Sequence, residues 1–252
     1  MPKVMIRELE KLDFRTKEAY KTLRTNLSFT GKDFRVISLT SCTPNEGKTS
    51  VSFQLAMSLA EDGKKTVLVD ADLRKSVLRR RYRTGHEKYG LSHYLSGQAE
   101  LEDAVCETNV PDFHIIFAGP VPPNPSELLG NQRFHALLQA LRAEYDYVIV
   151  DTPPLGSVID GAIVARESDG TVLVIESDSI SYKAAQNIVS QLEKAGCRLL
   201  GCVLNKVDLK LAGRYGKYYE KYYYSYYGSA ADEGETFPGP DQETAEAEET
   251  KK

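Results

Sequence analysis

Apolar runs alternate with amphipathic stretches through the middle of the chain. Several runs are continuously apolar and rich in Val and Ile, as is typical of strands covered on both faces. The runs that predict strands are 34–41, 65–72, 113–119, 145–152, 170–177 and 198–207. The longest stretches that predict helices are 50–63, 131–144 and 181–196. This alternation predicts an α/β fold with a mainly parallel central sheet flanked by helices.

The pattern changes towards both ends of the chain. Arg7–Phe29 predicts an amphipathic helix or two, so we expect a helical segment over 1–33 and the α/β domain over 34–210. A tyrosine-rich segment follows over 211–228. Residues 229–252 carry too few large apolar side chains to offset the entropy of ordering, so we expect a disordered acidic tail there.

Composition narrows the class of protein. A chain of 252 residues suits one large α/β domain with a tail. No apolar run approaches the ~20 residues that span a bilayer, and the amino terminus does not have the pattern of a signal peptide, so we expect a cytoplasmic protein. The cysteines lack metal-ligand spacing and are expected to be free thiols. The net charge of −4 argues against general nucleic-acid binding.

A phosphate-binding loop is predicted directly after the first strand, at Cys42–Thr49 (CTPNEGKT). It departs from the P-loop pattern GxxxxGK[ST] only at Cys42, where the first Gly normally stands. Gly47 allows the backbone to approach phosphate, and the amides there and at the start of the next helix attract anions. Lys48 is expected to contact phosphates and Thr49 to ligate Mg²⁺. The candidate nucleotide-binding residues of this segment are Asn45, Glu46, Gly47, Lys48, Thr49 and Ser50.

Carboxylates end two other predicted strands. Asp151 closes one strand, and Asp70 and Asp72 close another. In an open α/β sheet, such positions face the crevice where ligands bind. There they can hold Mg²⁺ and deprotonate an acceptor hydroxyl, although an Asp at a strand end is also an ordinary turn residue. The candidate catalytic residues are Lys48, Asp70, Asp72 and Asp151, and the candidate metal ligands are Thr49, Asp70 and Asp151.

Tyrosines crowd into a short segment after the last predicted strand. They do not follow the period of a helix or a strand, and no aliphatic residue stands among them to form a core. Beside a nucleotide site, such a row suggests an enzyme that phosphorylates tyrosine, beginning with its own tail. The alternative is an adhesive, stacking segment. The tyrosines are Tyr215, Tyr218, Tyr219, Tyr222, Tyr223, Tyr224, Tyr226 and Tyr227.

Three segments together resemble a known family. TSCTPNEGKTS, VLVDADLRK and YDYVIVDTPP are similar to the Walker A, A′ and B motifs of the bacterial tyrosine kinases (BY-kinases), in the stand-alone cytoplasmic form of capsule and exopolysaccharide systems. The likeness covers roughly residues 14–228. It implies a P-loop NTPase-type fold, MgATP as phosphoryl donor and autophosphorylation between subunits of a ring-like homo-oligomer.

The resemblance also implies partners and residue roles. Expected partners are a membrane adaptor, which activates the kinase and recruits it to the inner face of the cell membrane, and a cognate tyrosine phosphatase. The expected output is control of polysaccharide synthesis or export. Family members favour a small residue at Cys42. Asp70, Asp72 and Asp151 form the acidic set; we favour Asp70 as the base, and Asp72 stays open.

Two further groups of residues are less specific. Glu18, Lys21 and Arg24 match the spacing of the family's oligomerisation motif, but Lys21 replaces an Arg and lacks its planar fork. An isolated set of this kind is more often a solvated charged face. Asn205, in a segment that resembles a base-recognition motif of GTPases, is expected to contact adenine, unless it simply ends a strand.

Two other classes of protein remain as alternatives. A non-kinase ATPase switch of the partitioning or division-site type has the same motif order. Such switches typically carry a second lysine early in the P-loop, where this chain has Thr43. A scaffold phosphorylated by another kinase would keep the tyrosines but would not need the acidic motifs.

Overall fold

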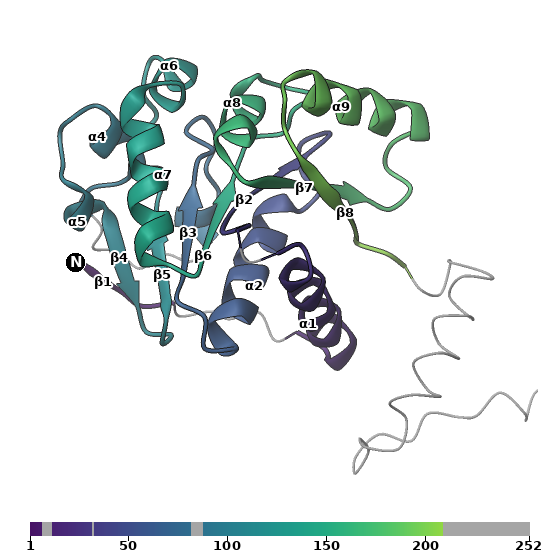
Figure 1. Cartoon of the computed structure of the whole chain (residues 1–252), viewed down its shortest axis with the longest axis horizontal. Coiled ribbons are helices and arrows are strands. Elements are labelled where there is room, and N and C mark those ends of the chain that lie inside the picture. The colour runs from purple at the N-terminus through teal and green to yellow at the C-terminus, as the bar shows by residue number, and fades with distance from the viewer. Residues whose placement is uncertain (7–11, 32, 82–87, 209–252) are drawn as a thin grey trace, which may run out of the picture. The chain divides into compact units, whose positions relative to one another are not determined.

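The structure is a computed structural model that describes residues 1–6, 12–31, 33–81 and 88–208. Almost all of these residues belong to one compact unit, Met1–Val207. Within the described part of the chain, eight strands form one sheet in the order β1-β4-β5-β3-β6-β2-β7-β8 (Figure 1). The predicted tyrosine-rich segment and acidic tail lie outside the described residues.

The strands that periodicity predicts are confirmed, each within its expected run. They pair in parallel with their neighbours, and among the strands of the described residues only the β4–β5 pair is antiparallel. The mainly parallel sheet is therefore also confirmed. The strands are β1 (Lys3–Val4), β2 (Val36–Ser41), β3 (Thr66–Asp70), β4 (Val105–Thr108), β5 (Phe113–Ile116), β6 (Tyr147–Asp151), β7 (Gly170–Glu176) and β8 (Leu199–Asn205).

Two short strands, β1 and β4, are not predicted by the periodicity of the sequence. β1 has only two residues, and it pairs in parallel with β4 at Lys3↔Glu107. β4 is four residues long and forms a hairpin with β5. Strands this short contain too few alternations for a period of two to stand out.

The three long helices that the sequence predicts are present as α2, α7 and α9. Local capping explains where two of them begin: the side chains of Asn131 and Ser181 accept hydrogen bonds from the backbone N–H groups of Phe134 and Ala184. The helix expected near the amino terminus begins at Phe14. The helices are α1 (Phe14–Ser28), α2 (Lys48–Glu61), α3 (Leu78–Arg81), α4 (Leu91–Leu95), α5 (Leu101–Ala104), α6 (Pro125–Leu129), α7 (Gln132–Glu144), α8 (Asp160–Glu167) and α9 (Tyr182–Lys194).

Both faces of the sheet are buried, as the apolar strands require. Ile37 and Leu68 pack in one core with α1 and α2, whereas Val36 and Val67 pack on the other face with α4 to α8. A third cluster places α9 beside α8. The adjacent strands β3, β6 and β2 are central, so the loops that follow them meet at the same edge of the sheet (Figure 1).

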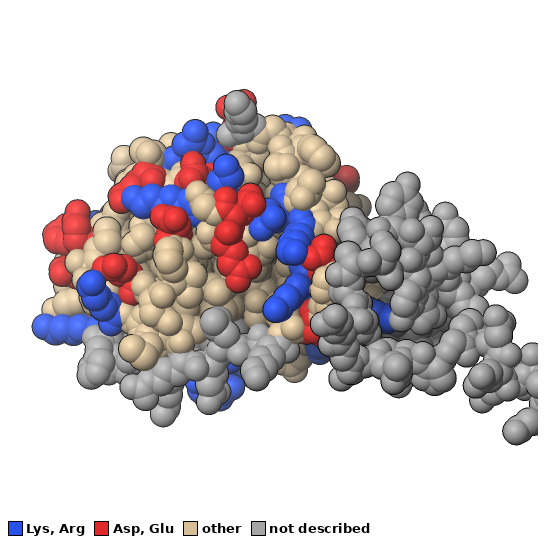
Figure 2. Space-filling view, turned by 90° about the horizontal axis from the view of Figure 1, so that it is seen from below, with Lys and Arg blue, Asp and Glu red and all other residues tan. Residues whose placement is uncertain are grey.

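The surface has mixed charge on the face seen in Figure 2, where Lys and Arg side chains are interspersed with Asp and Glu. Ion pairs near the amino ends of the strands include Lys65–Glu144, at 2.8 Å, and Arg142–Asp169. Among the described residues, no helix is both long and apolar enough to cross a membrane.

Candidate active site

Two of the predicted carboxylates lie side by side on neighbouring strands. Asp70 ends β3, Asp151 ends β6, and the parallel register pairs them directly. The backbone N–H of Ala71 donates to the Asp151 carbonyl at 2.8 Å, which continues the ladder one residue beyond β3. The alternation of strands and helices in the sequence thus brings together two acidic groups that are far apart in the chain.

The loop after β2 turns without a glycine at its first position. Left-handed backbone occurs at Asn45 (φ 70°) and Gly47 (φ 91°), but Cys42 does not have a positive φ. The buried Cys42 side chain packs beside Leu155, and its carbonyl accepts the N–H of Gly156 at 3.1 Å. Burial raises the pKa of the Cys42 thiol to about 12, so it is an unreactive packing group.

Glu46 shapes this loop from the inside. Glu46 is 1% exposed, and its carboxylate accepts a 2.7 Å hydrogen bond from the Thr43 N–H and a longer one from the Ser179 hydroxyl. The side chain therefore cannot reach a nucleotide. Only the Glu46 backbone remains for the binding role that the sequence suggests.

The amino end of α2 is arranged to receive an anion. Gly47 is the N-cap and offers no side-chain hydrogen bond, so the first N–H groups of the helix have no side-chain cap. A Cβ at Gly47 would lie 2.2 Å from Nδ2 of Asn205. Both the left-handed φ and this close approach require glycine at the position.

Two residues at and just after the end of β8 donate hydrogen bonds to the phosphate loop. Nδ2 of Asn205 donates to the Glu46 carbonyl at 2.9 Å, and Nζ of Lys206 donates to the Asn45 carbonyl at 2.7 Å. Lys206 also forms an ion pair with Glu176 at 3.1 Å. In this arrangement the Asn205 amide supports the loop, a role that the sequence did not suggest.

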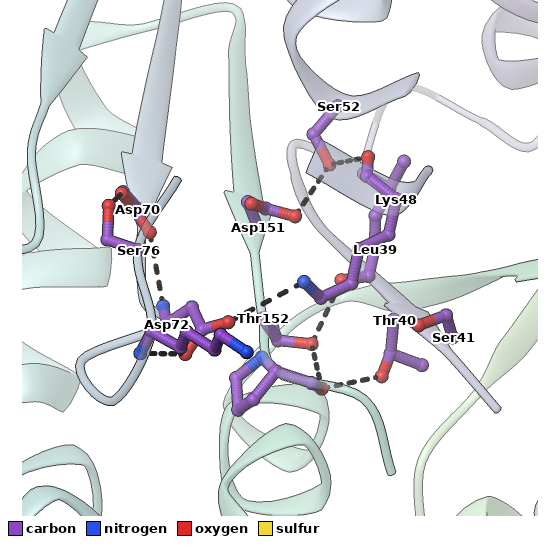
Figure 3. A network of polar contacts seen from close by, with 12 residues as sticks. Leu39, Thr40, Ser41, Lys48, Ser52, Asp70, Asp72, Ser76, Asp151 and Thr152 are labelled. Carbon is purple, nitrogen blue, oxygen red and sulfur yellow. Dashed lines mark hydrogen bonds and ion pairs between the residues drawn. The ribbon is translucent and has the colours of Figure 1, made fainter. Parts of the chain in front are cut away.

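Lys48 lies between the phosphate loop and the carboxylates. Its Nζ is 3.6 Å from Oδ2 of Asp72, and the two side chains are only 13% and 9% exposed. Figure 3 shows Lys48 reaching from the start of α2 towards Asp72, beside Asp151 and Ser52. The Ser52 hydroxyl is 3.2 Å from Oδ1 of Asp151.

The carboxylates affect one another's protonation. Burial, reinforced by the nearby Asp151, raises the pKa of Asp70 to about 8. Asp70 accepts hydrogen bonds from the Ser76 hydroxyl and, at 3.2 Å, from the Asp72 N–H. Burial also raises the pKa of Asp151, although the positive charge of Lys48 acts to lower it. A cation placed between these groups would relieve this repulsion.

The donors suit a nucleotide with a hard divalent cation. Thr49 follows Lys48 on α2, and a hydrogen bond joins its side chain to Asp151. Hydroxyl and carboxylate oxygens are the ligands that Mg²⁺ prefers, and Mg²⁺ often takes only one or two carboxylates plus substrate phosphates. The described residues contain no cluster of three or more His, Cys, Asp or Glu able to hold a metal alone.

The other predicted residues lie apart from this centre. Glu18 and Lys21 form an ion pair on α1, whereas Arg24 donates to the Ser58 carbonyl of α2 at 2.7 Å and pairs with Asp62 at 3.2 Å. The oligomerisation set is thus split between a surface pair and a tether to α2. The eight clustered tyrosines lie outside the described residues.

Comparisons with known proteins agree with this geometry. A family model described as an AAA domain matches residues 34–200. The tyrosine-protein kinase CpsD of Streptococcus agalactiae is 43% identical over 206 residues, which cover 81% of this chain and 90% of that protein. The chain belongs to the bacterial tyrosine kinases. A BY-kinase assignment was expected from the three motifs, and it is confirmed.

Solved structures extend this result to the fold. The kinase domain of the Escherichia coli tyrosine kinase ETK matches with a TM-score of 0.72 and 31% identity, over 82% of this chain and 92% of that chain. The septum site-determining protein MinD from Pyrococcus horikoshii, complexed with Mg-ADP, matches with a TM-score of 0.59 and 26% identity, over 68% of this chain and 69% of that chain. The P-loop NTPase-type fold is confirmed, and the tyrosine kinases are the more similar proteins.

Several polar residues of the candidate site were not predicted from the sequence. Ser52 and Ser76 contact the carboxylates, and Arg74 and Asp160 form an ion pair beside them. Ser52 stands one helical turn after Lys48, so its spacing could have indicated that both side chains lie on the same face of α2. No local pattern pairs Arg74 with Asp160, because 86 positions separate them.

Proposed function

We propose that this kinase binds MgATP at the start of α2 and transfers the γ-phosphoryl group to tail tyrosines of a neighbouring copy. The observation that carries this proposal is the pairing of Asp70 with Asp151 beside Lys48 and the uncapped helix end. One acidic pair, one cation and one set of free amides can together orient a phosphoryl group and an acceptor.

The nucleotide is held mainly by backbone groups. The amides from Asn45 to Ser50 would donate to the phosphates, and Lys48, which pairs with Asp72 in the free protein, would contact them as a point charge. Asn205 donates its amide N–H to the loop, which leaves its Oδ1 atom available as an acceptor for the amino group of adenine.

Thr49, Asp70 and Asp151 would supply the protein oxygens that hold Mg²⁺. The ion would supply positive charge next to the phosphates, which would stabilise the negative charge that develops during transfer. Without it, Asp70 and Asp151 are buried carboxylates with raised pKa values.

Asp70 is the better candidate for proton acceptor. A phenol has a pKa near 10 and is a weak nucleophile when neutral, so a nearby carboxylate assists it. In the ligand-free protein the Asp70 carboxylate accepts hydrogen bonds from the Ser76 hydroxyl and the Asp72 N–H, which are neutral donors. Asp72 instead pairs with Lys48 and accepts the Lys75 N–H at 3.0 Å.

In the cell, we propose that the kinase controls capsular or extracellular polysaccharide synthesis or export. A membrane adaptor would activate it and hold this cytoplasmic protein at the inner face of the membrane, and a tyrosine phosphatase would reset it. These partners are supported by the family resemblance of the three motifs.

Replacing all eight clustered tyrosines by Phe is expected to remove most autophosphorylation and to leave ATP affinity unchanged, because the phenols are acceptors only. Purified protein is incubated with MgATP, blotted for phosphotyrosine and mapped by mass spectrometry. Label that persists mainly on Tyr20 or Tyr147 would contradict the tail assignment. A wild type that hydrolyses ATP without forming phosphotyrosine would instead favour the ATPase switch.

We also propose that phosphorylation loosens a ring whose seam includes Glu18, Lys21 and Arg24. Arg24 links α1 to α2. A neighbouring copy that contacts α1 can therefore shift α2, the helix that begins at the phosphate loop. Each phosphotyrosine adds about −1.5 to −2 charges, which the acidic site repels. Sedimentation velocity should show a smaller phosphorylated form and a larger phosphatase-treated form. The all-Phe variant is the control, and equal sizes of the two wild-type forms would refute the proposal.

A further inference from the structure

A second polar cluster lies beside the candidate site and has no part in the proposed chemistry. The Arg74 guanidinium contacts both oxygens of Asp160, with Nε 2.7 Å from Oδ2 and Nη2 3.1 Å from Oδ1. The Ser126 hydroxyl donates to Oδ1 of Asp160 at 2.6 Å, and Nη2 of Arg74 donates to that hydroxyl at 2.9 Å. Asp160 is completely buried.

This cluster joins three segments that surround the acidic site. Arg74 lies in the loop after β3, Asp160 begins α8 beyond the loop that follows β6, and Ser126 belongs to α6. Although burial opposes ionisation, the hydrogen bonds from Arg74 and Ser126 hold the pKa of Asp160 below its usual range. The carboxylate is therefore charged, and its two-pronged geometry suits only an arginine fork.

The loop that carries Arg74 is also built around the site carboxylates. Asp72 Oδ1 accepts the Lys75 N–H at 3.0 Å, Asp70 Oδ1 accepts the Asp72 N–H, and Asp70 Oδ2 accepts the Ser76 hydroxyl. Arg74 stands inside this short set of contacts. Any shift of its backbone must therefore move the loop that orients Asp70 and Asp72.

We propose that Arg74 is a positioning residue, which braces the loop after β3 against α8 and so orients the Asp70 and Asp72 carboxylates. The inference rests on the proposed use of these carboxylates as metal and acceptor groups. The Arg74–Asp160 fork acts on them through the backbone, and Arg74 itself touches neither nucleotide nor acceptor.

The test compares Arg74→Lys, which keeps the charge but loses the fork, with Arg142→Lys. Arg142 forms its ion pair with Asp169 away from the site, at the amino end of the strands, so it serves as a matched control. Hydrogen exchange of residues 71–76 is measured in ligand-free protein. Calorimetry gives ATP affinity with and without Mg²⁺, and autophosphorylation gives kcat, KM and the Mg²⁺ requirement.

For Arg74→Lys we expect faster exchange at 71–76, a roughly 10-fold or greater rise in the Mg²⁺ concentration for half-maximal activity, and a similar fall in kcat. ATP affinity without Mg²⁺ should stay within about twofold of wild type, since the phosphate loop is untouched. Ser126→Ala should give the same pattern more weakly and covers the case in which the first variant fails to fold.

Unchanged Mg²⁺ dependence and kcat in both variants would overturn the proposal and leave the cluster a purely structural one. If the wild type forms no phosphotyrosine, the proposal of tail autophosphorylation fails by itself. The exchange and calorimetric measurements would still decide whether Arg74 positions the carboxylates.

Discussion

Lys48→Met is expected to reduce tyrosine phosphorylation by about 10²–10³-fold or more, because it removes a charge oriented towards the phosphates. Its loss has a second effect. Lys48 is the cation that faces Asp72 and opposes the raised pKa of Asp151, so the ligand-free variant should also be less stable near neutral pH. Quantitative phosphotyrosine blotting measures the first effect, and thermal unfolding measured by circular dichroism measures the second.

The control for this change is Lys183→Met, on the exposed side of α9. It removes the same charge and adds the same side chain far from the carboxylates, so activity and stability should match the wild type. Near-normal phosphorylation by pure Lys48→Met would show that the phosphoryl group is bound elsewhere.

Asp70→Asn is expected to separate activity from stability. The pKa of Asp70 is about 8 in the folded, ligand-free protein, against an ordinary value of 3.8. Because the pKa of this carboxyl is raised on folding, the protein is relatively most stable below pH 3.8, where the group is protonated in both the folded and the unfolded state. The free energy of unfolding then falls as pH rises from there towards 8. Wild-type protein without nucleotide or metal should therefore lose stability between pH 4 and pH 8. Asn keeps the shape without the charge, so the variant should be more stable than the wild type at pH 8.

The same substitution should lower tyrosine phosphorylation by about 10²–10⁴-fold, since the proton acceptor is removed. Urea unfolding across the pH range tests the expected effect on stability, and a phosphorylation assay tests the expected effect on activity. Asp103→Asn, on the exposed side of α5, should change neither. A variant with the wild-type pH dependence of stability would show that Asp70 is not the titrating group.

Periodicity and strand ends predict much of the fold and the acidic site. The runs around Asp70 and Asp151 are apolar on both faces, so their strands had to be central and parallel, and the carboxylates had to meet at the same edge. The short β1 and β4 could not be predicted, since they depend on pairing with one another and with β5.

Side-chain partnerships are harder to predict than strands. The sequence predicts Glu46 to be a nucleotide-binding residue, yet its side chain is buried because the tight turn offers it the N–H of Thr43. Arg74 and Asp160 become partners only once α8 packs beside β3 and β6. Such contacts depend on tertiary structure and leave no periodic trace along the chain.

The hydrogen bonds from the end of β8 to the phosphate loop extend the catalytic unit to Lys206. Asn205 and Lys206 bond consecutive carbonyls of a loop about 160 positions earlier, beyond the last residue of the matched domain. A chain shortened before Asn205 would retain every motif residue that contacts phosphate, but it would lose the supports that keep the loop in shape. Deletions meant to probe the tyrosine tail should therefore begin after Lys206, where the nucleotide site is still whole.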